Sequence, residues 1–440
     1  MSNQTTRRRF IKTSAATGIG FWVAGGLQAQ ESNSPNEKVM MASVGIGGKG
    51  SSDSRDAGSQ GQMVAICDVD KKRLAGAASK FAGAKPYTDF RVMLNEMGDK
   101  IDAVTVSTPD HTHAPAALMA MRMGKHCFCQ KPLTRTVYEA RLMADVAKEM
   151  GVATQMGNQG TAASALRQAA AAVKAGHIGA PKEVHVWTNR PIWPQGGERG
   201  APQPVPEHLD WDLWLSCAPE RPYSGGYHPF SWRGWWDFGT GALGDMACHN
   251  VNLPFHACDL ADPTSIQAVT PGHNRDSFPK WSVITFQFPK TETRPAIKFV
   301  WYDGGKFPPK EVMGGETPKT NGVVIVGDKD TMVTDDSNGG NWRLVSGNRP
   351  ADLEYEQSPG HFQEFIRAIK GGPAAKSNFV DAAGPLTETI LLGNLAVWAA
   401  NEEGEGPLVE WDASNMRVKN IEGLESLVKP TYRKGYVLDA

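Results

Sequence analysis

Three residues of this 440-residue chain, Lys131, Asp245 and His249, have side chains of the types that could exchange protons with a hydroxyl group. Lys131 follows a short apolar stretch and precedes Pro132, while Asp245 and His249 are four positions apart. If residues 241–250 form a helix, Asp245 and His249 share one of its faces. An ammonium group, a carboxylate and an imidazole at one site can remove a hydroxyl proton or return it. We expect Lys131 to be the base, with a pKa lowered by burial.

Each of these residues also has a simpler interpretation. Lys131 could be a surface lysine before a turn that begins at Pro132, and Asp245 with His249 could be a pair of metal ligands. No third cluster of His, Cys or Asp has convincing spacing for a metal site, so we predict no metal.

A second group of residues has the pattern of a dinucleotide site. Residues 44–50 read Val-Gly-Ile-Gly-Gly-Lys-Gly and fit GxGxxG after an apolar stretch. In this pattern the first glycine allows a tight turn, the second admits the pyrophosphate, and the third lets a helix begin close by. Asp68 follows 23 positions after Gly45, close to the spacing of an acid that binds the adenosine ribose. A carboxylate there favours NAD over NADP, although Lys71, Lys72 and Arg73 weaken that preference and leave NADP possible.

Residues 107–113, Ser-Thr-Pro-Asp-His-Thr-His, follow another apolar run, where ligands of open parallel sheets bind. His113 could line the nicotinamide site or cap a helix that starts at Pro109 and Asp110. The predicted cofactor contacts are Gly45, Ile46, Gly47, Gly48, Lys49, Gly50, Asp68, Ser107, Thr108, Pro109, His113, Gln130, Lys131, Gln159 and Arg233. The predicted substrate contacts are Lys131, Trp232, Asp245 and His249.

Strands that alternate with helices must position these residues. Apolar runs of strand length occur at 39–46, 63–67, 103–107, 126–129 and 152–156, with helical patterns between them. This alternation predicts a doubly wound parallel sheet, so we expect a dinucleotide-binding Rossmann domain over residues 38–160.

A different pattern follows residue 160. We expect a helix at 162–174, strands at 183–188, 281–288, 296–301 and 322–326, and helices at 361–369 and 386–401. Hairpin-like connections predict an α+β domain over 161–440 with a large, open, mostly antiparallel sheet. The last helix is expected to pack between the two domains.

The stretch before Gly244 is rich in proline, glycine and tryptophan, and we expect it to be ordered. Its aromatic residues could stack on sugar faces or pack in a core. Those considered for stacking are Trp193, Tyr223, Tyr227, His228, Trp235 and Trp236. Arg233 could contact an anionic group.

The amino terminus carries Arg7, Arg8, Arg9 and Lys12, followed by a weakly apolar stretch. This resembles a twin-arginine export signal, so we expect a signal at 1–29, a polar linker at 30–37 and a periplasmic or otherwise exported protein. The formal net charge of -1 becomes -5 once the four basic residues of the signal are removed. Such a chain lacks the basic surface that nucleic acids or anionic membranes require. The six cysteines show no paired spacing and are expected to be mostly buried thiols.

Taken in order, these motifs resemble the Gfo/Idh/MocA family of glucose-fructose oxidoreductase and inositol dehydrogenase over residues 38–435. The resemblance implies hydride transfer between NAD and a secondary alcohol of a sugar, glycoside or cyclitol. It also implies that Lys131, Asp245 and His249 are catalytic and that the protein is a homodimer or homotetramer. The family usually carries Glu where Gln130 stands. Loss of that anion predicts a lower pKa for Lys131, or it marks a subgroup with a different substrate.

Two other functions remain open at this stage. A glycoside hydrolase or lyase could use NAD transiently, by oxidation, elimination and re-reduction. A non-catalytic cofactor-bound sensor is disfavoured because Lys131 and His249 are both present. Free NAD is scarce outside the cytoplasm, so we expect a tightly bound cofactor.

Overall fold

The computed structural model describes residues 38–348, 350, 352–436 and 438. The predicted export signal and linker lie outside these described residues. None of the helices in the described segments is long and apolar enough to cross a membrane.

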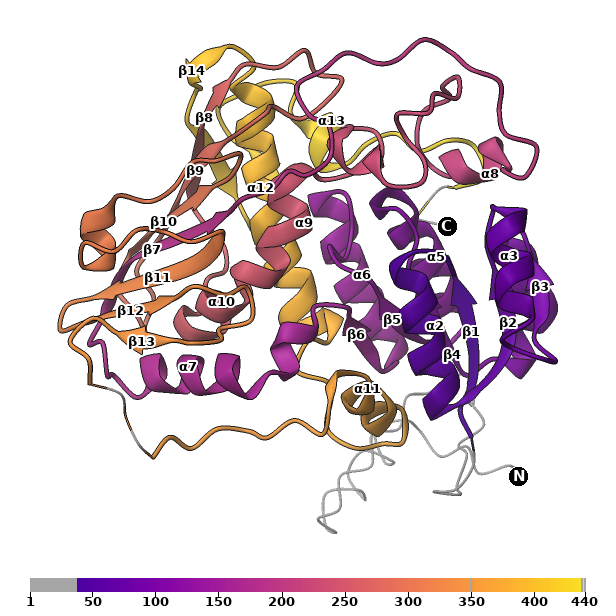
Figure 1. The fold of residues 1–440 in the computed structure, drawn as a ribbon, viewed down its shortest axis with the longest axis horizontal. Coiled ribbons are helices and arrows are strands. Elements are labelled where there is room, and N and C mark those ends of the chain that lie inside the picture. The colour runs from indigo at the N-terminus through magenta and orange to yellow at the C-terminus, as the bar shows by residue number, and fades with distance from the viewer. Residues whose placement is uncertain (1–37, 349, 351, 437, 439–440) are drawn as a thin grey trace, which may run out of the picture. The chain divides into compact units, whose positions relative to one another are not determined.

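A six-stranded parallel sheet, in the order β3-β2-β1-β4-β5-β6, confirms the predicted doubly wound arrangement (Figure 1). Its strands are β1 (Met40–Val44), β2 (Gln62–Cys67), β3 (Lys85–Tyr87), β4 (Ala103–Val106), β5 (His126–Cys129) and β6 (Thr154–Met156). Strand order reverses between β1 and β4, which is where open α/β sheets form a ligand crevice at their carboxyl edge. The short edge strand β3 was not predicted.

Five helices connect these strands: α2 (Lys49–Gln60), α3 (Lys71–Ala78), α4 (Phe90–Met97), α5 (Asp110–Arg122) and α6 (Val137–Met150). Local capping explains where three of them begin. The Asp70 and Asp89 carboxylates accept backbone N–H groups at the starts of α3 and α4, and Thr136 and Glu139 form a capping box on α6.

A second, ten-stranded sheet has the order β13-β12-β11-β7-β10-β9-β8-β15-β16, with β14 paired to β8. Only β7 and β10 pair in parallel, so the predicted mostly antiparallel sheet is confirmed. Its strands are β7 (Pro181–Thr188), β8 (Ser265–Pro271), β9 (Val283–Phe288), β10 (Ile297–Tyr302), β11 (Asn321–Gly327), β12 (Thr331–Thr334), β13 (Arg343–Leu344), β14 (Glu403–Glu405), β15 (Val409–Asp412) and β16 (Arg417–Val418).

The remaining helices are α7 (Ser164–Lys174), α8 (Trp211–Leu215), α9 (Gly241–Asn250), α10 (Asn252–Cys258), α11 (His361–Ile369), α12 (Gly384–Ala399) and α13 (Glu425–Val428). Helix α12 is almost entirely buried and contacts α6 on one side and β8 and β9 on the other (Figure 1). Arg141 of α6 and Glu388 of α12 form an ion pair at this contact. A late helix was therefore correctly predicted, with a start two residues earlier than expected.

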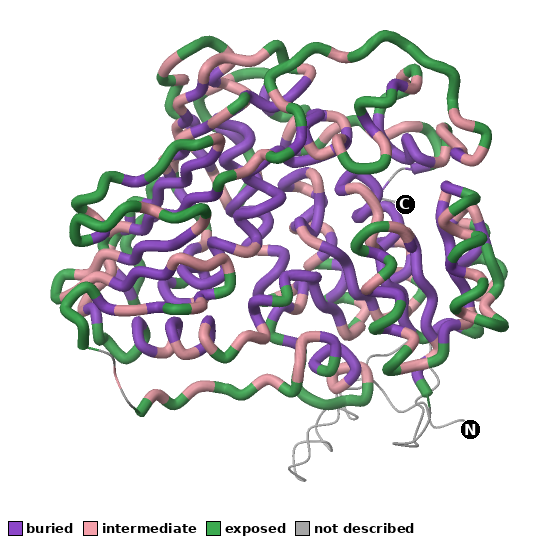
Figure 2. Tube along the Cα trace, in the orientation of Figure 1, coloured by how far each residue is buried: buried purple, intermediate pink, exposed green. Residues whose placement is uncertain are grey.

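One apolar core extends from the parallel sheet through α12 to the antiparallel sheet, as the buried segments in Figure 2 show. It includes Val104 of β4, Leu391 of α12 and Phe286 of β9. All six cysteines are buried and form no disulfide, and burial raises the pKa of each thiol, so the prediction of buried thiols is confirmed.

The aromatic-rich segment between β7 and α9 forms a separate core of its own. The Trp211 and Trp214 rings stack at 4.6 Å, and Trp214 meets Phe238 edge to face at 4.9 Å. The backbone of residues 208–210 hydrogen-bonds to Val69 and Lys71, directly after β2. The segment is thereby fixed beside the strand that ends in Asp68.

Candidate active site

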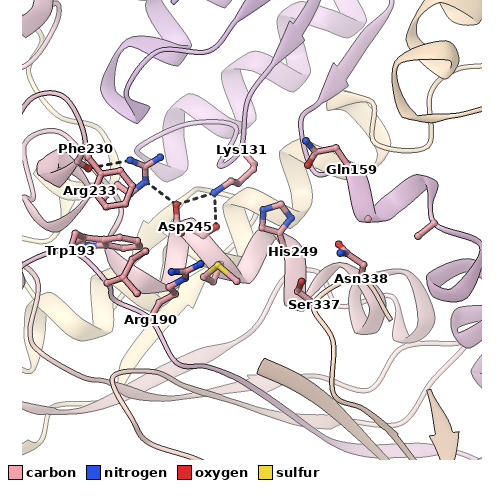
Figure 3. Close-up of a pocket in the computed structure, with 14 residues that line it drawn as sticks. Lys131, Gln159, Arg190, Trp193, Phe230, Arg233, Asp245, His249, Ser337 and Asn338 are labelled. Carbon is pink, nitrogen blue, oxygen red and sulfur yellow. Dashed lines mark hydrogen bonds and ion pairs between the residues drawn. The ribbon is translucent and has the colours of Figure 1, made fainter. Parts of the chain in front are cut away.

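A cavity of about 540 Å³ brings together the three residues predicted to be catalytic (Figure 3). Its lining consists of Lys131, Gln159, Gly160, Ala163, Arg190, Ile192, Trp193, Phe230, Arg233, Asp245, Met246, His249, Ser337 and Asn338. Lys131 comes from the end of β5, while Asp245 and His249 lie one turn apart on α9. The cavity therefore opens where the carboxyl edge of the parallel sheet meets a helix that packs on the antiparallel sheet.

Helix α9 is anchored at its first residues. Thr240, just before the helix, donates from its hydroxyl to the Asp110 carboxylate at the start of α5, at 2.8 Å. Asn394 of α12 donates to the Thr240 carbonyl at 3.1 Å. These hydrogen bonds hold the start of α9 against α5 and α12, and so fix the position of Asp245 and His249 relative to the end of β5.

Lys131 and Asp245 form a buried ion pair. The Lys131 Nζ atom lies 2.9 Å from Asp245 Oδ1 and 3.0 Å from the Asp245 carbonyl oxygen. Arg233 Nε lies 3.1 Å from the same Oδ1 atom. Burial opposes charge on Asp245, but the two cations outweigh it and lower its pKa to about 2.

The pKa of Lys131 is raised, so the expected depression of this pKa is wrong for the protein without dinucleotide. Burial lowers the pKa, but the nearby Asp245 carboxylate outweighs that effect. Lys131 is therefore a protonated hydrogen-bond donor at neutral pH.

His249 has the opposite charge state. Burial, and then the positive charge of Lys131, lower its pKa to about 3, so the imidazole is neutral at neutral pH. Within the described part of the chain, its ring nitrogens make no hydrogen bond or ion pair. A neutral imidazole that faces a cavity without a partner can accept a proton from a bound hydroxyl group.

The glycine-rich turn fits a dinucleotide phosphate. Gly45 adopts φ +78°, and a Cβ atom there would lie 2.7 Å from the Ser107 carbonyl oxygen. A Cβ atom on Gly50 would lie 2.0 Å from the Gly45 carbonyl oxygen, so only glycine lets α2 begin this close to the turn. No side chain caps the start of α2. The Gly50 and Ser51 N–H groups donate to the Gly47 and Gly48 carbonyl oxygens at 3.0 and 3.2 Å, so the start of α2 offers an anion chiefly the positive end of the helix dipole.

Asp68 lies at the end of β2, as predicted for the ribose ligand. Its carboxylate accepts the Ile46 N–H at 3.0 Å and the Asp70 N–H at 2.9 Å. Burial raises its pKa, and these two hydrogen bonds oppose that rise. Each oxygen keeps a further lone pair for a ribose hydroxyl. These residues therefore fit NAD, which Gly45, Gly50 and Asp68 would hold across the β1–β4 crevice.

The Ser107–His113 stretch has a supporting role. His113 is buried between the carbonyl oxygens of Thr108 and Pro132, at 2.8 Å from each. Burial lowers its pKa to about 4, although both carbonyls favour the protonated ring. His113 thus links the residues after β4 to those after β5 and does not line the cavity.

Gln130 is part of a buried network that the sequence did not reveal. Its side-chain Nε2 donates to Asp53 Oδ2 at 2.9 Å, and its side-chain Oε1 accepts the Lys131 backbone N–H at 3.2 Å. The Asp53 carboxylate also accepts from Ser107 at 2.8 Å and pairs with Lys49. The Asp53 carboxylate on α2 is therefore hydrogen-bonded to Gln130, which stands where the resemblance leads us to expect Glu.

Arg233 and Trp232 differ in their exposure to the cavity. Arg233 lines the cavity, and its guanidinium lies 4.2 Å from the centre of the Trp232 ring. Trp232 is buried among the aromatic residues before α9 and does not line the cavity, so it supports Arg233 instead of facing a substrate. Of the aromatic residues considered for stacking, only Trp193 lines the cavity, together with Phe230, which was not predicted.

Three polar lining residues were missed: Arg190, Ser337 and Asn338. Arg190 follows the end of β7, and the other two follow β12. The only local signal was a polar residue shortly after a strand. Among the described residues, no group of three or more His, Cys, Asp or Glu side chains could hold a metal ion.

Two family models match the chain. One, described as an oxidoreductase family with an NAD-binding Rossmann fold, matches residues 39–158. The other, the C-terminal alpha/beta domain of the same oxidoreductase family, matches residues 163–293. Together they span more than half of the chain.

Similar proteins carry the names of sugar and cyclitol dehydrogenases. Levoglucosan dehydrogenase of Pseudarthrobacter phenanthrenivorans is 28% identical over 189 residues, which are 43% of this chain and 40% of the relative. Inositol 2-dehydrogenase of Rubrobacter xylanophilus is 29% identical over 119 residues, 26% of this chain and 33% of the relative. The chain thus spans about two fifths or less of the length of these curated relatives.

Solved structures support the fold over a longer range. Aldose-aldose oxidoreductase from Caulobacter crescentus, complexed with glycerol, has a TM-score of 0.58 at 18% identity, over 85% of this chain and all of that one. The WlbA dehydrogenase from Bordetella pertussis, in complex with NADH and UDP-GlcNAcA, has a TM-score of 0.56 at 19% identity, over 83% and 97% of the two chains. Because the two family models match the chain and the dinucleotide-binding turn is present, the chain belongs to the Gfo/Idh/MocA oxidoreductase family.

Proposed function

We propose that the protein transfers a hydride between bound NAD and a carbon that carries a secondary hydroxyl group in a sugar, glycoside or cyclitol. The observation that carries this proposal is the meeting of Lys131, Asp245 and His249 around one cavity beside the sheet that fits the dinucleotide. The names of the relatives, dehydrogenases of levoglucosan and inositol, support the substrate class.

The charge states assign a role to each side chain. When bound, NAD accepts or donates the hydride. Protonated Lys131 donates a hydrogen bond to the reacting oxygen, and Asp245 holds the ammonium group in place. Neutral His249 accepts the hydroxyl proton during oxidation and returns it during reduction. This assigns proton acceptance to His249, whereas the sequence favoured Lys131 as the base.

The aromatic-rich segment supports retention of the cofactor through turnover. Leu209 pairs with Asp70, and His228 Nε2 lies 3.4 Å from the Asp70 carboxylate, so the segment flanks the end of β2. In Rossmann domains that end binds the adenosine ribose. We propose that this contact slows release of the dinucleotide.

Three further expectations remain predictions. Export through the twin-arginine pathway and a division of the mature chain near residue 160 rest on the sequence. Assembly as a homodimer or homotetramer rests on the family resemblance. Fractionation of cells that express the full chain, and light scattering of the purified protein, test the first and the last.

The first experiment identifies the cofactor and the reaction together. Purified protein is denatured, and any released dinucleotide is identified by mass spectrometry. Native protein is then mixed with a panel of sugars, glycosides and cyclitols while absorbance at 340 nm is followed. We expect bound NAD and a lasting absorbance change with at least one secondary alcohol.

Matched variants connect the reaction to the site. Lys131→Met and His249→Asn are each expected to slow the absorbance change by about 10²- to 10⁴-fold while the bound dinucleotide is retained. Lys80→Met, at an exposed lysine beyond α3, is the control and should leave the rate unchanged. Failure to bind any dinucleotide would refute the proposal. Glycoside cleavage without a lasting absorbance change would replace it with the transient-redox hydrolase.

A further inference from the structure

The lining of the cavity has an imbalance of charge that the hydride-transfer proposal does not use. Three of its residues are cations, Lys131, Arg190 and Arg233, whereas Asp245 is its one carboxylate. His249 adds no charge, because burial holds its pKa far below neutrality. Two positive charges therefore remain without an anion in the lining.

Among the described residues, no acidic side chain forms an ion pair with Arg190. Its backbone is fixed, since its carbonyl accepts the Gly304 N–H at 2.7 Å. Its Nε atom is buried without a hydrogen-bond partner, and among the described residues its guanidinium has no ion pair. A buried guanidinium donor without an acceptor is costly, and a ligand that supplies the acceptor removes this cost.

Arg233 is only partly neutralised. It shares the Asp245 carboxylate with Lys131, so one anion serves two cations. Its Nη1 atom donates to the Phe230 carbonyl at 3.1 Å, which leaves other N–H groups of the guanidinium for a ligand.

Both arginines lie at one end of the cavity. Figure 3 shows Arg190, Arg233, Trp193 and Phe230 on the side opposite Gln159 and Asn338, with Lys131 and His249 between the two groups. Phe230 at this end is 44% exposed, and Ile192, two residues after Arg190 in sequence, also lines the cavity and is 62% exposed. The arginine end thus combines unneutralised donors with an apolar wall that suits a sugar face or an aglycone.

We propose that this end of the cavity binds an anionic group of the substrate, so that the protein acts on a sugar or glycoside bearing a carboxylate or phosphate. Guanidinium groups bind both anions through paired N–H donors. The reacting hydroxyl then lies toward Lys131 and His249, and the anion toward Arg190. This inference rests on the proposed function, because it assigns the substrate class of the same site.

Direct binding tests it without requiring turnover. NAD-loaded protein is titrated in a calorimeter with methyl β-D-glucuronide and methyl β-D-glucoside, then with glucose 6-phosphate and glucose. We expect the anionic member of at least one pair to bind 10-fold or more tightly than its neutral partner. Which pair responds distinguishes a carboxylate from a phosphate.

Variants at Arg190 assign the preference to this residue. Arg190→Met should reduce the anionic preference by about 10- to 100-fold, and Arg190→Lys should retain part of it. Arg122→Met, at the far end of α5, is the control and should bind like the parent protein. The bound NAD content of each variant shows that it has folded.

Two outcomes overturn the inference. One is that neutral sugars bind as tightly as anionic ones throughout the panel. Absence of measurable binding by both members of every pair counts as the same outcome. The other is an anionic preference that persists unchanged in Arg190→Met. Either result leaves hydride transfer intact if neutral sugars still change the absorbance of the NAD-loaded protein.

Discussion

The side chain of Gln130 is hydrogen-bonded to the buried carboxylate of Asp53. The side chains of the two residues are hydrogen-bonded at 2.9 Å, and both residues are almost completely buried. An amide at position 130 is the group that a carboxylate neighbour requires, because it can donate to Asp53 and still accept from the Lys131 N–H. The side chain at position 130 is therefore coupled by a hydrogen bond to a residue on another element.

This coupling predicts the effect of restoring the usual residue. Gln130→Glu places a second carboxylate against Asp53, and two such charges cannot both remain ionised in a buried site. We expect the variant to lose about 2–4 kcal/mol of unfolding free energy at pH 7 in urea denaturation.

The double variant Asp53→Asn/Gln130→Glu provides the control. It exchanges the positions of the amide and the carboxylate. We expect its loss of unfolding free energy to be at least about 1 kcal/mol smaller than the sum of the losses in the two single variants. Additive effects of the two substitutions would show that the pair is not coupled.

At the scale of elements, the start of α2 depends on the absence of a side chain at Gly50. Gly50→Ala would bring a methyl group against the Gly45 carbonyl oxygen, so α2 must shift away from the turn. We expect this variant to lose at least about 10-fold in NAD affinity, measured by calorimetry on protein freed of dinucleotide, because the phosphate site is built from this turn.

Gly76→Ala in α3 is the matched control. A Cβ atom at Gly76 would contact nothing within 4 Å, so this variant should bind NAD normally and gain about 0.5–1 kcal/mol in stability. Normal NAD affinity in Gly50→Ala would mean that the turn does not form the phosphate site.

The parallel sheet and the motifs after its strands could be predicted because their signals are local. The apolar runs before Gly45, Asp68 and Lys131 each mark a strand, and these three residues come one or two positions after the strand ends. Strand β8 (Ser265–Pro271) was missed because polar Gln267 and Thr270 interrupt its apolar residues. Pairing with β9 and β15 defines this strand, and no short window of sequence shows that pairing.

The missed cavity residues have the same explanation. Arg190 follows β7, while Ser337 and Asn338 follow β12. They share a cavity because β11 pairs with both strands. The β11–β12 pairing is a local hairpin, but the β11–β7 pairing joins residues more than a hundred positions apart in sequence.

At the scale of the whole molecule, burial keeps a group of histidines neutral. Desolvation lowers the pKa of six of them to between about 3 and about 4: His111, His113, His126, His249, His256 and His361. In the unfolded chain each would titrate near 6.5. Between these pH values the unfolded state binds protons that the folded state does not. The stability contributed by these neutral histidines is therefore fully present above about pH 6.5 and is lost as the pH decreases.

Buried carboxyl groups act in the opposite direction: the pKa values of Asp68, Glu139 and Glu388 are raised, and two other carboxyl groups have large upward shifts. Desolvation raises the pKa of Asp110 to about 7 and that of Asp303 to about 6, so the folded state holds these protons longer than the unfolded state. Because the histidines outnumber these carboxyls, we expect the unfolding free energy to fall by at least about 2.7 kcal/mol per pH unit between pH 6 and 5. Urea denaturation at a series of pH values measures this slope.

His256→Gln tests whether the histidines cause the slope. His256 lies on α10, and its neutral ring is replaced by a neutral amide, so the folded protein at pH 8 should change little. The variant removes one group that binds a proton only on unfolding, and the slope between pH 6 and 5 should decrease by about 1.4 kcal/mol per pH unit. An unchanged slope in this variant, or a parent protein equally stable at pH 7 and pH 5, would mean that buried neutral histidines do not control the acid sensitivity of the fold.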